Sequence, residues 1–168
     1  MRVYIPATFA MLTELSENSV FTARSGWGFA LTPALVEFYT SGDEEEIADA
    51  AFQDAAEASL RLLAIGDEEK FPHRRIVVTV DLPDEQVSLE PENGESVVKL
   101  SPAQIQLDQV AALHVDLAEA EEQTKAAIAV IDASDLGDTD AELTVGDAQD
   151  NLMAWYDPSE LPFLIELL

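Results

Sequence analysis

Three side chains near the ends of two expected strands have the residue types that metal ligation or proton transfer requires. Asp81 ends an apolar, β-branched run, and His114 and Asp116 close another one. Sites in open α/β sheets lie beyond the carboxyl ends of strands, so we expect these side chains to be neighbours. A histidine with two carboxylates suits a divalent cation or a general base. In a competing interpretation, Asp116 caps a helix and His114 is a partly buried, hydrogen-bonded ring.

The segment His73-Arg74-Arg75 is the only tight basic cluster in a chain with 34 acidic and 8 basic residues. Guanidinium groups bind carboxylate and phosphate as bidentate forks, so these three residues are candidates for an anion-binding site. The competing interpretation is internal. With so many acids nearby, the arginines neutralise carboxylates of an adjacent helix at a strand end.

A cluster of five acidic residues lies before and at the start of the helix expected at 139–155. Closely spaced oxygen ligands are what a hard cation such as calcium prefers. The spacing does not match the twelve-residue calcium loop, because the glycine and the terminal glutamate are misplaced. A solvated acidic loop is the competing interpretation, so a divalent cation stays possible and no other cofactor is predicted. The cluster consists of Asp132, Asp135, Asp138, Asp140 and Glu142.

These residues must be positioned by an alternation of strands and helices. Phe71–Asp81 is the clearest strand, because β-branched residues dominate it between prolines. Asn93-Gly94 between two apolar runs predicts an antiparallel hairpin near a sheet edge. Capping boxes and first-position prolines predict the helix starts. Strands are expected at 2–5, 27–31, 71–81, 87–89, 97–100 and 110–115, and helices at 9–17, 33–39, 43–65, 116–131, 139–155 and 158–164.

The pattern predicts an α/β domain, with α+β as the alternative, in which helices pack against a mixed sheet of five or six strands. A length of 168 residues suits a single domain over 1–168. In this interpretation Leu152 and Trp155 complete the apolar stripe of the helix at 139–155 and lie in the core. The competing interpretation is that Trp155-Tyr156 anchors a partner.

The net charge of −26 opposes binding to nucleic acid or anionic lipid, since both depend on Lys and Arg displacing counterions. Direct nucleic-acid binding is therefore not expected. The chain has no cysteine, so thiolate chemistry and disulfides are excluded. The N-terminal stretch does not read as a signal peptide, and no apolar run approaches the roughly 20 residues that span a bilayer. We expect a cytoplasmic protein.

Several segments in order resemble a family of short, acidic actinobacterial proteins of unknown function, over nearly the full length. The resemblance implies a bacterial cytosolic setting and one domain, and it implies no activity. The segments are Val3-Tyr4-Ile5-Pro6-Ala7-Thr8, Ala30-Leu31-Thr32-Pro33, Arg74-Arg75-Ile76-Val77-Val78, His114-Val115-Asp116 and Trp155-Tyr156-Asp157-Pro158-Ser159-Glu160-Leu161-Pro162.

Three functional hypotheses follow. The anionic composition and the missing catalytic motif favour a non-enzymatic regulatory or interaction protein that engages a basic partner surface. The alternative is a small metal-assisted or acid/base hydrolase that uses Asp81, His114 and Asp116. A third explanation is that the charge is an adaptation to high salt and has no partner.

Overall fold

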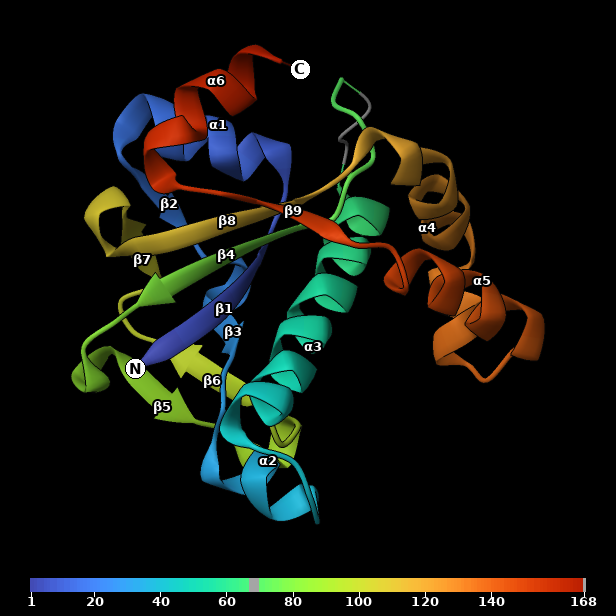
Figure 1. The fold of residues 1–168 in the computed structure, drawn as a ribbon, viewed down its shortest axis with the longest axis horizontal. Coiled ribbons are helices and arrows are strands. Elements are labelled where there is room, and N and C mark those ends of the chain that lie inside the picture. The colour runs from blue at the N-terminus through green and yellow to red at the C-terminus, as the bar shows by residue number, and fades with distance from the viewer. Residues whose placement is uncertain (67–69, 168) are drawn as a thin grey trace.

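A seven-stranded sheet organises the chain in the computed structural model, which describes residues 1–66 and 70–167 (Figure 1). Its strand order is β5-β6-β3-β1-β4-β8-β9, and every neighbouring pair is antiparallel. The strands are β1 (Arg2–Ala7), β3 (Trp27–Phe29), β4 (Ile76–Asp81), β5 (Val87–Leu89), β6 (Val97–Leu100), β8 (Val110–Asp116) and β9 (Met153–Tyr156). A separate antiparallel pair joins β2 (Val20–Thr22) to β7 (Gln104–Gln106).

The structure confirms a helix-and-strand domain but changes the predicted sheet. It has seven strands rather than five or six, and it is antiparallel rather than mixed, so the α+β alternative describes it better. The seventh strand is β9, which fell within the helix expected at 139–155. That helix ends at Gln149, because β9 hydrogen-bonds along the open edge of β8. Leu152 and Trp155 were expected in the core and are instead 82% and 58% exposed.

The hairpin around Asn93-Gly94 is confirmed, with β5 at the sheet edge and β6 beside it. Its connection is a short 3₁₀ turn over Pro91–Asn93 rather than a two-residue turn. Gly94 follows with a φ of 142°, a conformation that side chains with a Cβ rarely adopt. The predicted strand at 71–81 begins in the ladder only at Ile76.

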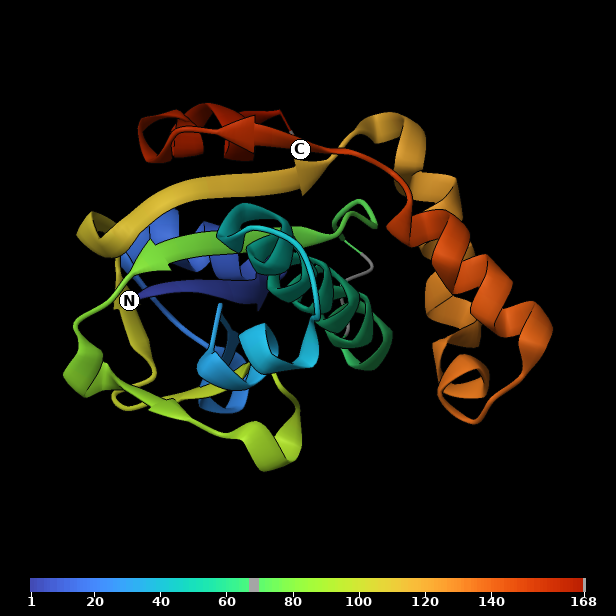
Figure 2. The ribbon, with the colours of Figure 1, turned by 60° about the horizontal axis from the view of Figure 1, so that its bottom comes forward.

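The helices are α1 (Phe9–Asn18), α2 (Pro33–Phe38), α3 (Glu44–Ile65), α4 (Glu121–Asp135), α5 (Thr139–Gln149) and α6 (Leu161–Glu166). Alternate residues of each strand face opposite sides of the sheet. One side, with Ile5 and Val78, forms the main core together with α1 and α6. The other side, with Tyr4 and Val77, packs against α3. In Figures 1 and 2, α4 and α5 lie together to one side of the sheet, where they contact α3.

Helix α3 determines how the second face of the sheet is covered. Asp43 caps it by accepting a hydrogen bond from the Glu46 N–H at 2.9 Å. Its buried stripe includes three alanines, Ala51, Ala55 and Ala56, which let the helix approach β1 and its neighbours closely. Ser59 fixes the position: its hydroxyl donates to the Ala7 carbonyl at 2.8 Å and accepts from the Ile76 N–H at 3.0 Å. Within the described ranges, no helix combines the length and apolar character that crossing a bilayer requires.

Two glycines give a matched test of this packing. A Cβ on Gly28 in β3 would lie 2.7 Å from Val3 Cγ1, whereas a Cβ on Gly146 in α5 meets nothing within 4 Å. Gly28→Ala is expected to destabilise the fold by about 1–3 kcal/mol through overpacking. Gly146→Ala is expected to stabilise it by about 0.5–1 kcal/mol through helix propensity. Urea denaturation measures both, and effects of the same sign would contradict this packing.

Candidate functional site

The predicted site residues Arg75 and Asp116 form a buried ion pair. Arg75 is 0% exposed and Asp116 is 1% exposed. The guanidinium donates to both carboxylate oxygens, with Nη2 2.7 Å from Oδ1 and Nε 2.9 Å from Oδ2. Its remaining donors reach the Gln149 side chain at 2.9 Å and the Asn151 carbonyl at 2.8 Å. The Thr124 hydroxyl also donates to Asp116, so the pair is enclosed by polar partners.

The predicted anion-binding cluster is therefore largely occupied from within the chain. Arg74 pairs with Glu121 at the start of α4, at 2.7 Å. Arg75 is held by Asp116, which belongs to a neighbouring strand rather than to a helix. His73 is half-buried beside them. The geometry agrees with the internal interpretation of the two arginines.

The three predicted catalytic residues do not converge. Asp81 ends β4, and its carboxylate forms a bidentate ion pair with Arg2 at 3.0 Å. The hydrogen bond from Arg2 lowers the pKa of Asp81. Asp116 lies at the other end of β4, beside Arg75, because β8 runs antiparallel to β4. Six residues of strand separate the two ends, or about 20 Å.

The structure also assigns other roles to Asp116 and to the acidic cluster at 132–142 than the sequence predicted. Asp116 was expected to cap a helix, but it ends β8, and α4 begins only at Glu121 after a 3₁₀ turn. In the acidic cluster at 132–142, Asp138 caps α5 and Asp135 pairs with Arg61. Among the described residues, no group of three or more His, Asp or Glu side chains is arranged to hold a metal ion.

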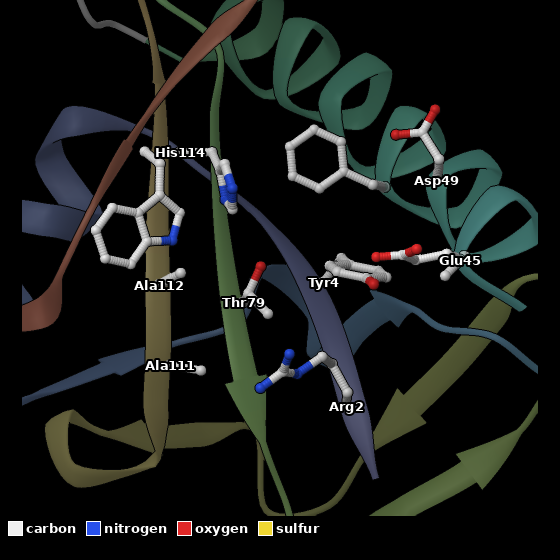
Figure 3. Close-up of a pocket in the computed structure, with 11 residues that line it drawn as sticks. Arg2, Tyr4, Glu45, Asp49, Thr79, Ala111, Ala112 and His114 are labelled. Atoms are coloured by element: carbon white, nitrogen blue, oxygen red, sulfur yellow. The ribbon is translucent and has the colours of Figure 1, made fainter.

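His114 instead lines a cleft between α3 and the strands β1, β4, β8 and β9, which we call the acidic cleft (Figure 3). Its volume is about 460 Å³. A second hollow of about 270 Å³ shares Asp49, Phe52 and His114 with it and continues to Met153, so the two form a groove along α3. The acidic cleft is lined by Arg2, Tyr4, Glu45, Ala48, Asp49, Phe52, Thr79, Ala111, Ala112, His114 and Trp155.

Aromatic rings form much of the wall. The Phe52 ring meets the His114 ring edge-on, with centroids 4.8 Å apart, and meets Tyr4 edge-on at 5.7 Å. Trp155 is the register partner of His114 on β9, and its ring is largely exposed. Burial lowers the pKa of His114, so this ring is neutral at neutral pH.

Two buried polar atoms beneath this cleft have no hydrogen-bond partner among the described residues: Thr79 Oγ1 and His114 Nδ1. Figure 3 shows the Thr79 hydroxyl on the side of the residue that faces His114. Buried polar groups in native proteins are nearly always paired, and exceptions often occur at functional sites. These two atoms therefore single out the acidic cleft among the hollows of the molecule.

The charge of the cleft is unbalanced. Arg2, the one Arg or Lys among the described residues that line it, is neutralised by Asp81. Glu45 and Asp49 stand on the exposed side of α3 and form no ion pair within the described part of the chain. In Figure 3 both carboxylates lie across the cleft from His114. The cleft therefore presents two free negative charges beside an aromatic wall.

A family model described as a family of unknown function (DUF6912) matches residues 1–165. The chain belongs to that family. Neither the curated proteins nor the solved structures contain a match. This membership confirms the resemblance to an uncharacterised family over nearly the full length, while the actinobacterial origin stays a prediction.

Sequence reasoning missed most of the acidic cleft. Glu45 and Asp49 fall in the helix expected at 43–65 and Thr79 in the strand expected at 71–81, and none of the three was singled out as a site residue. Trp155 was placed in the core because its spacing matched a helical stripe. The detectable signal was the alternation within β4, which puts the polar Thr79 on the same face as Val77 and Asp81.

The ion pairs at the two ends of β4 give a matched prediction. Asp116→Asn leaves a buried guanidinium without its counter-charge and is expected to cost about 3–5 kcal/mol of folding stability. Asp81→Asn removes the corresponding charge from a pair whose members are 57% and 58% exposed. Its expected cost is below about 1 kcal/mol. Urea unfolding measures the free energy of unfolding of both variants. A similar loss in the two would show that burial does not determine how much an ion pair contributes to stability.

The unpaired hydroxyl predicts a stabilising substitution. Thr79→Val removes a buried polar atom without a partner and keeps the side-chain shape, so unfolding stability is expected to rise by about 1 kcal/mol. Thr124→Val is the control, because the Thr124 hydroxyl bonds to Asp116 and its loss is expected to cost about 1–3 kcal/mol. A loss of stability in Thr79→Val, measured by thermal unfolding, would mean that the hydroxyl already has a structural partner.

Proposed function

We propose that this protein is a non-enzymatic interaction protein that binds a basic segment of a partner protein and takes a cationic side chain into the acidic cleft. The observation that carries the proposal is the pair of uncompensated carboxylates, Glu45 and Asp49, facing an aromatic wall. A cation gains from both, because carboxylates attract it and aromatic faces present negative charge to it.

The unpaired atoms of the cleft suit the same occupant. An ammonium or guanidinium group has only hydrogen-bond donors. The Thr79 hydroxyl can accept a hydrogen bond, and a neutral imidazole carries one acceptor nitrogen, so His114 can accept one as well. Both atoms are buried, so contact with the inserted group requires the side chains around them to shift.

The extent of the groove favours a protein segment over an isolated cation. The two adjoining hollows share three residues and continue along α3 towards β9. Leu152 and Trp155 are exposed beside them and offer apolar contact to residues that flank the inserted cation. The net charge of −26 would steer a basic partner towards this surface and raise the association rate.

The test uses Trp155 as the reporter in a Trp27→Phe background, since these are the two tryptophans of the chain. A short oligolysine peptide is expected to change Trp155 fluorescence saturably, and the same peptide with acetylated lysines is not. Glu45→Gln/Asp49→Asn is expected to weaken binding about tenfold or more, equivalent to about 1.4 kcal/mol.

The control removes the same charge elsewhere. Glu142 and Asp147 are exposed on α5, outside the acidic cleft. Glu142→Gln/Asp147→Asn is expected to change the affinity less than about twofold, because neither side chain lines the acidic cleft and exposed charges are screened by salt. Equal weakening by the two double variants would reduce the interaction to general charge attraction, and unsaturable titrations would refute the proposal.

A further inference from the structure

A second cleft lies on the same face of the sheet, against the C-terminal half of α3, and we call it the basic cleft. Its volume is about 370 Å³, and it is bounded by β1, β3, β6 and the 3₁₀ turn at Pro91–Asn93. The acidic cleft uses residues 45–52 of α3, whereas the basic cleft uses residues 58–62. It is lined by Pro6, Arg24, Ser25, Trp27, Phe29, Ala58, Arg61, Leu62, Asn93 and Val97.

The cations around this cleft are not equally neutralised. Arg61 is held by Glu57 at 3.1 Å and by Asp135 at 2.7 Å, so two carboxylates more than offset its single positive charge. Arg24 is exposed at the cleft and pairs with no carboxylate in the described residues. Lys99, beside Trp27, likewise contacts a ring and a carbonyl rather than a described carboxylate. Two of the chain's 8 basic residues, Arg24 and Lys99, therefore lie at or beside this cleft without an ion-pair partner among the described residues.

The aromatic wall of the basic cleft is held in place before any ligand arrives. The Lys99 ammonium lies 4.2 Å from the centroid of the Trp27 ring, and it donates to the Ser25 carbonyl at 2.6 Å. Lys99 is also the register partner of Trp27 across β3 and β6. A flat ring fixed by a cation on one side is a rigid surface, and rigid surfaces lower the entropic cost of binding.

The backbone beside Arg24 is strained. Ser25 has a φ of 56° and a ψ of 14°, the left-handed conformation that residues with a Cβ rarely adopt. Gly26 follows with a φ of 73°, and a Cβ there would lie 3.1 Å from the Leu100 carbonyl oxygen. Left-handed residues outside glycine cluster at ligand sites, where the surrounding structure maintains them. This turn places Arg24 and Ser25 at the cleft.

We propose that the basic cleft is a second binding site, for a small organic anion whose carboxylate or phosphate is held by Arg24 and whose apolar body lies against Trp27 and Phe29. Four of the other lining residues are apolar and suit a ring or a short hydrocarbon: Pro6, Ala58, Leu62 and Val97. The volume lies within the range of small-molecule sites, about 300–1,000 Å³.

The net charge of the chain decides which anions are suitable. A polyanion such as nucleic acid would extend over the acidic surface and be repelled. A single anionic group inside the cleft is affected mainly by nearby cations, because screening limits exposed charges to about 8 Å at physiological salt. The site is therefore selective for small anions over polymers.

The experiment uses phenyl phosphate as the probe and Trp27 as the reporter, in a Trp155→Phe background that leaves Trp27 as the remaining tryptophan. Phenyl phosphate is expected to change Trp27 fluorescence saturably. Phenol, which lacks the charge, and benzylamine, which has the opposite charge, are expected to bind at least about tenfold more weakly. Binding of phenol as tight as that of phenyl phosphate would overturn the anionic part of the proposal.

Matched variants test the role of Arg24. Arg24→Gln is expected to weaken phenyl phosphate binding about tenfold or more. Lys125→Gln removes the same charge from an exposed position on α4 and is expected to have little effect. Circular dichroism confirms that both variants are folded. Equal weakening by the two variants, or no saturable response of Trp27, would overturn the proposal without affecting the test of the acidic cleft.

Discussion

The buried ion pair between Arg75 and Asp116 is the constraint on which the rest of the structure depends. Removing two charges from water costs several kcal/mol per ion, and only a complete set of hydrogen bonds offsets that cost. Here the set comes from Arg75 just before β4, from Asp116 at the end of β8, from Thr124 in α4, and from Gln149 and Asn151 at the end of α5 and just after it. The pair therefore joins the sheet to the helices beside it and fixes where β9 begins its pairing with β8.

Helix α3 shapes the surface that carries the two candidate binding sites, because both the acidic cleft and the basic cleft lie along it. Ser59 holds it over β1 and β4, and its buried alanines keep it close to the sheet. One helix cannot cover seven strands, so hollows remain on both of its flanks. The flank towards β8 and β9 has free carboxylates and unpaired acceptors, and the flank towards β3 and β6 has unbalanced cations. The two sides thus attract ligands of opposite charge although they share one helix.

The sequence predicted most elements correctly, because their signals are local. Asp43 and Thr32 cap the helices that follow them, and Asn93-Gly94 marks the hairpin. The site was harder to predict, because its contacts are distant in the chain. The partner of Arg75 is 41 residues away and that of Asp81 is 79 residues away. Strand order decides such pairings, and β9 was hidden by a spacing that also fits a helix. Without β9, Trp155 could not be placed opposite His114.

The position of β1 within the sheet affects the order in which the protein can fold during synthesis. β1 is synthesised before the other strands, yet it pairs with β3 and β4, and the sheet is completed only by β8 and β9. Arg75 has no counter-charge until Asp116 has emerged, and one of its donors has no partner until Asn151 has emerged, so the guanidinium must stay hydrated. Long-range pairing of this kind slows folding, since the entropy of closing large loops is lost before the contacts form. A stalled chain that ends before β8 would therefore remain open, with apolar strands available to chaperones.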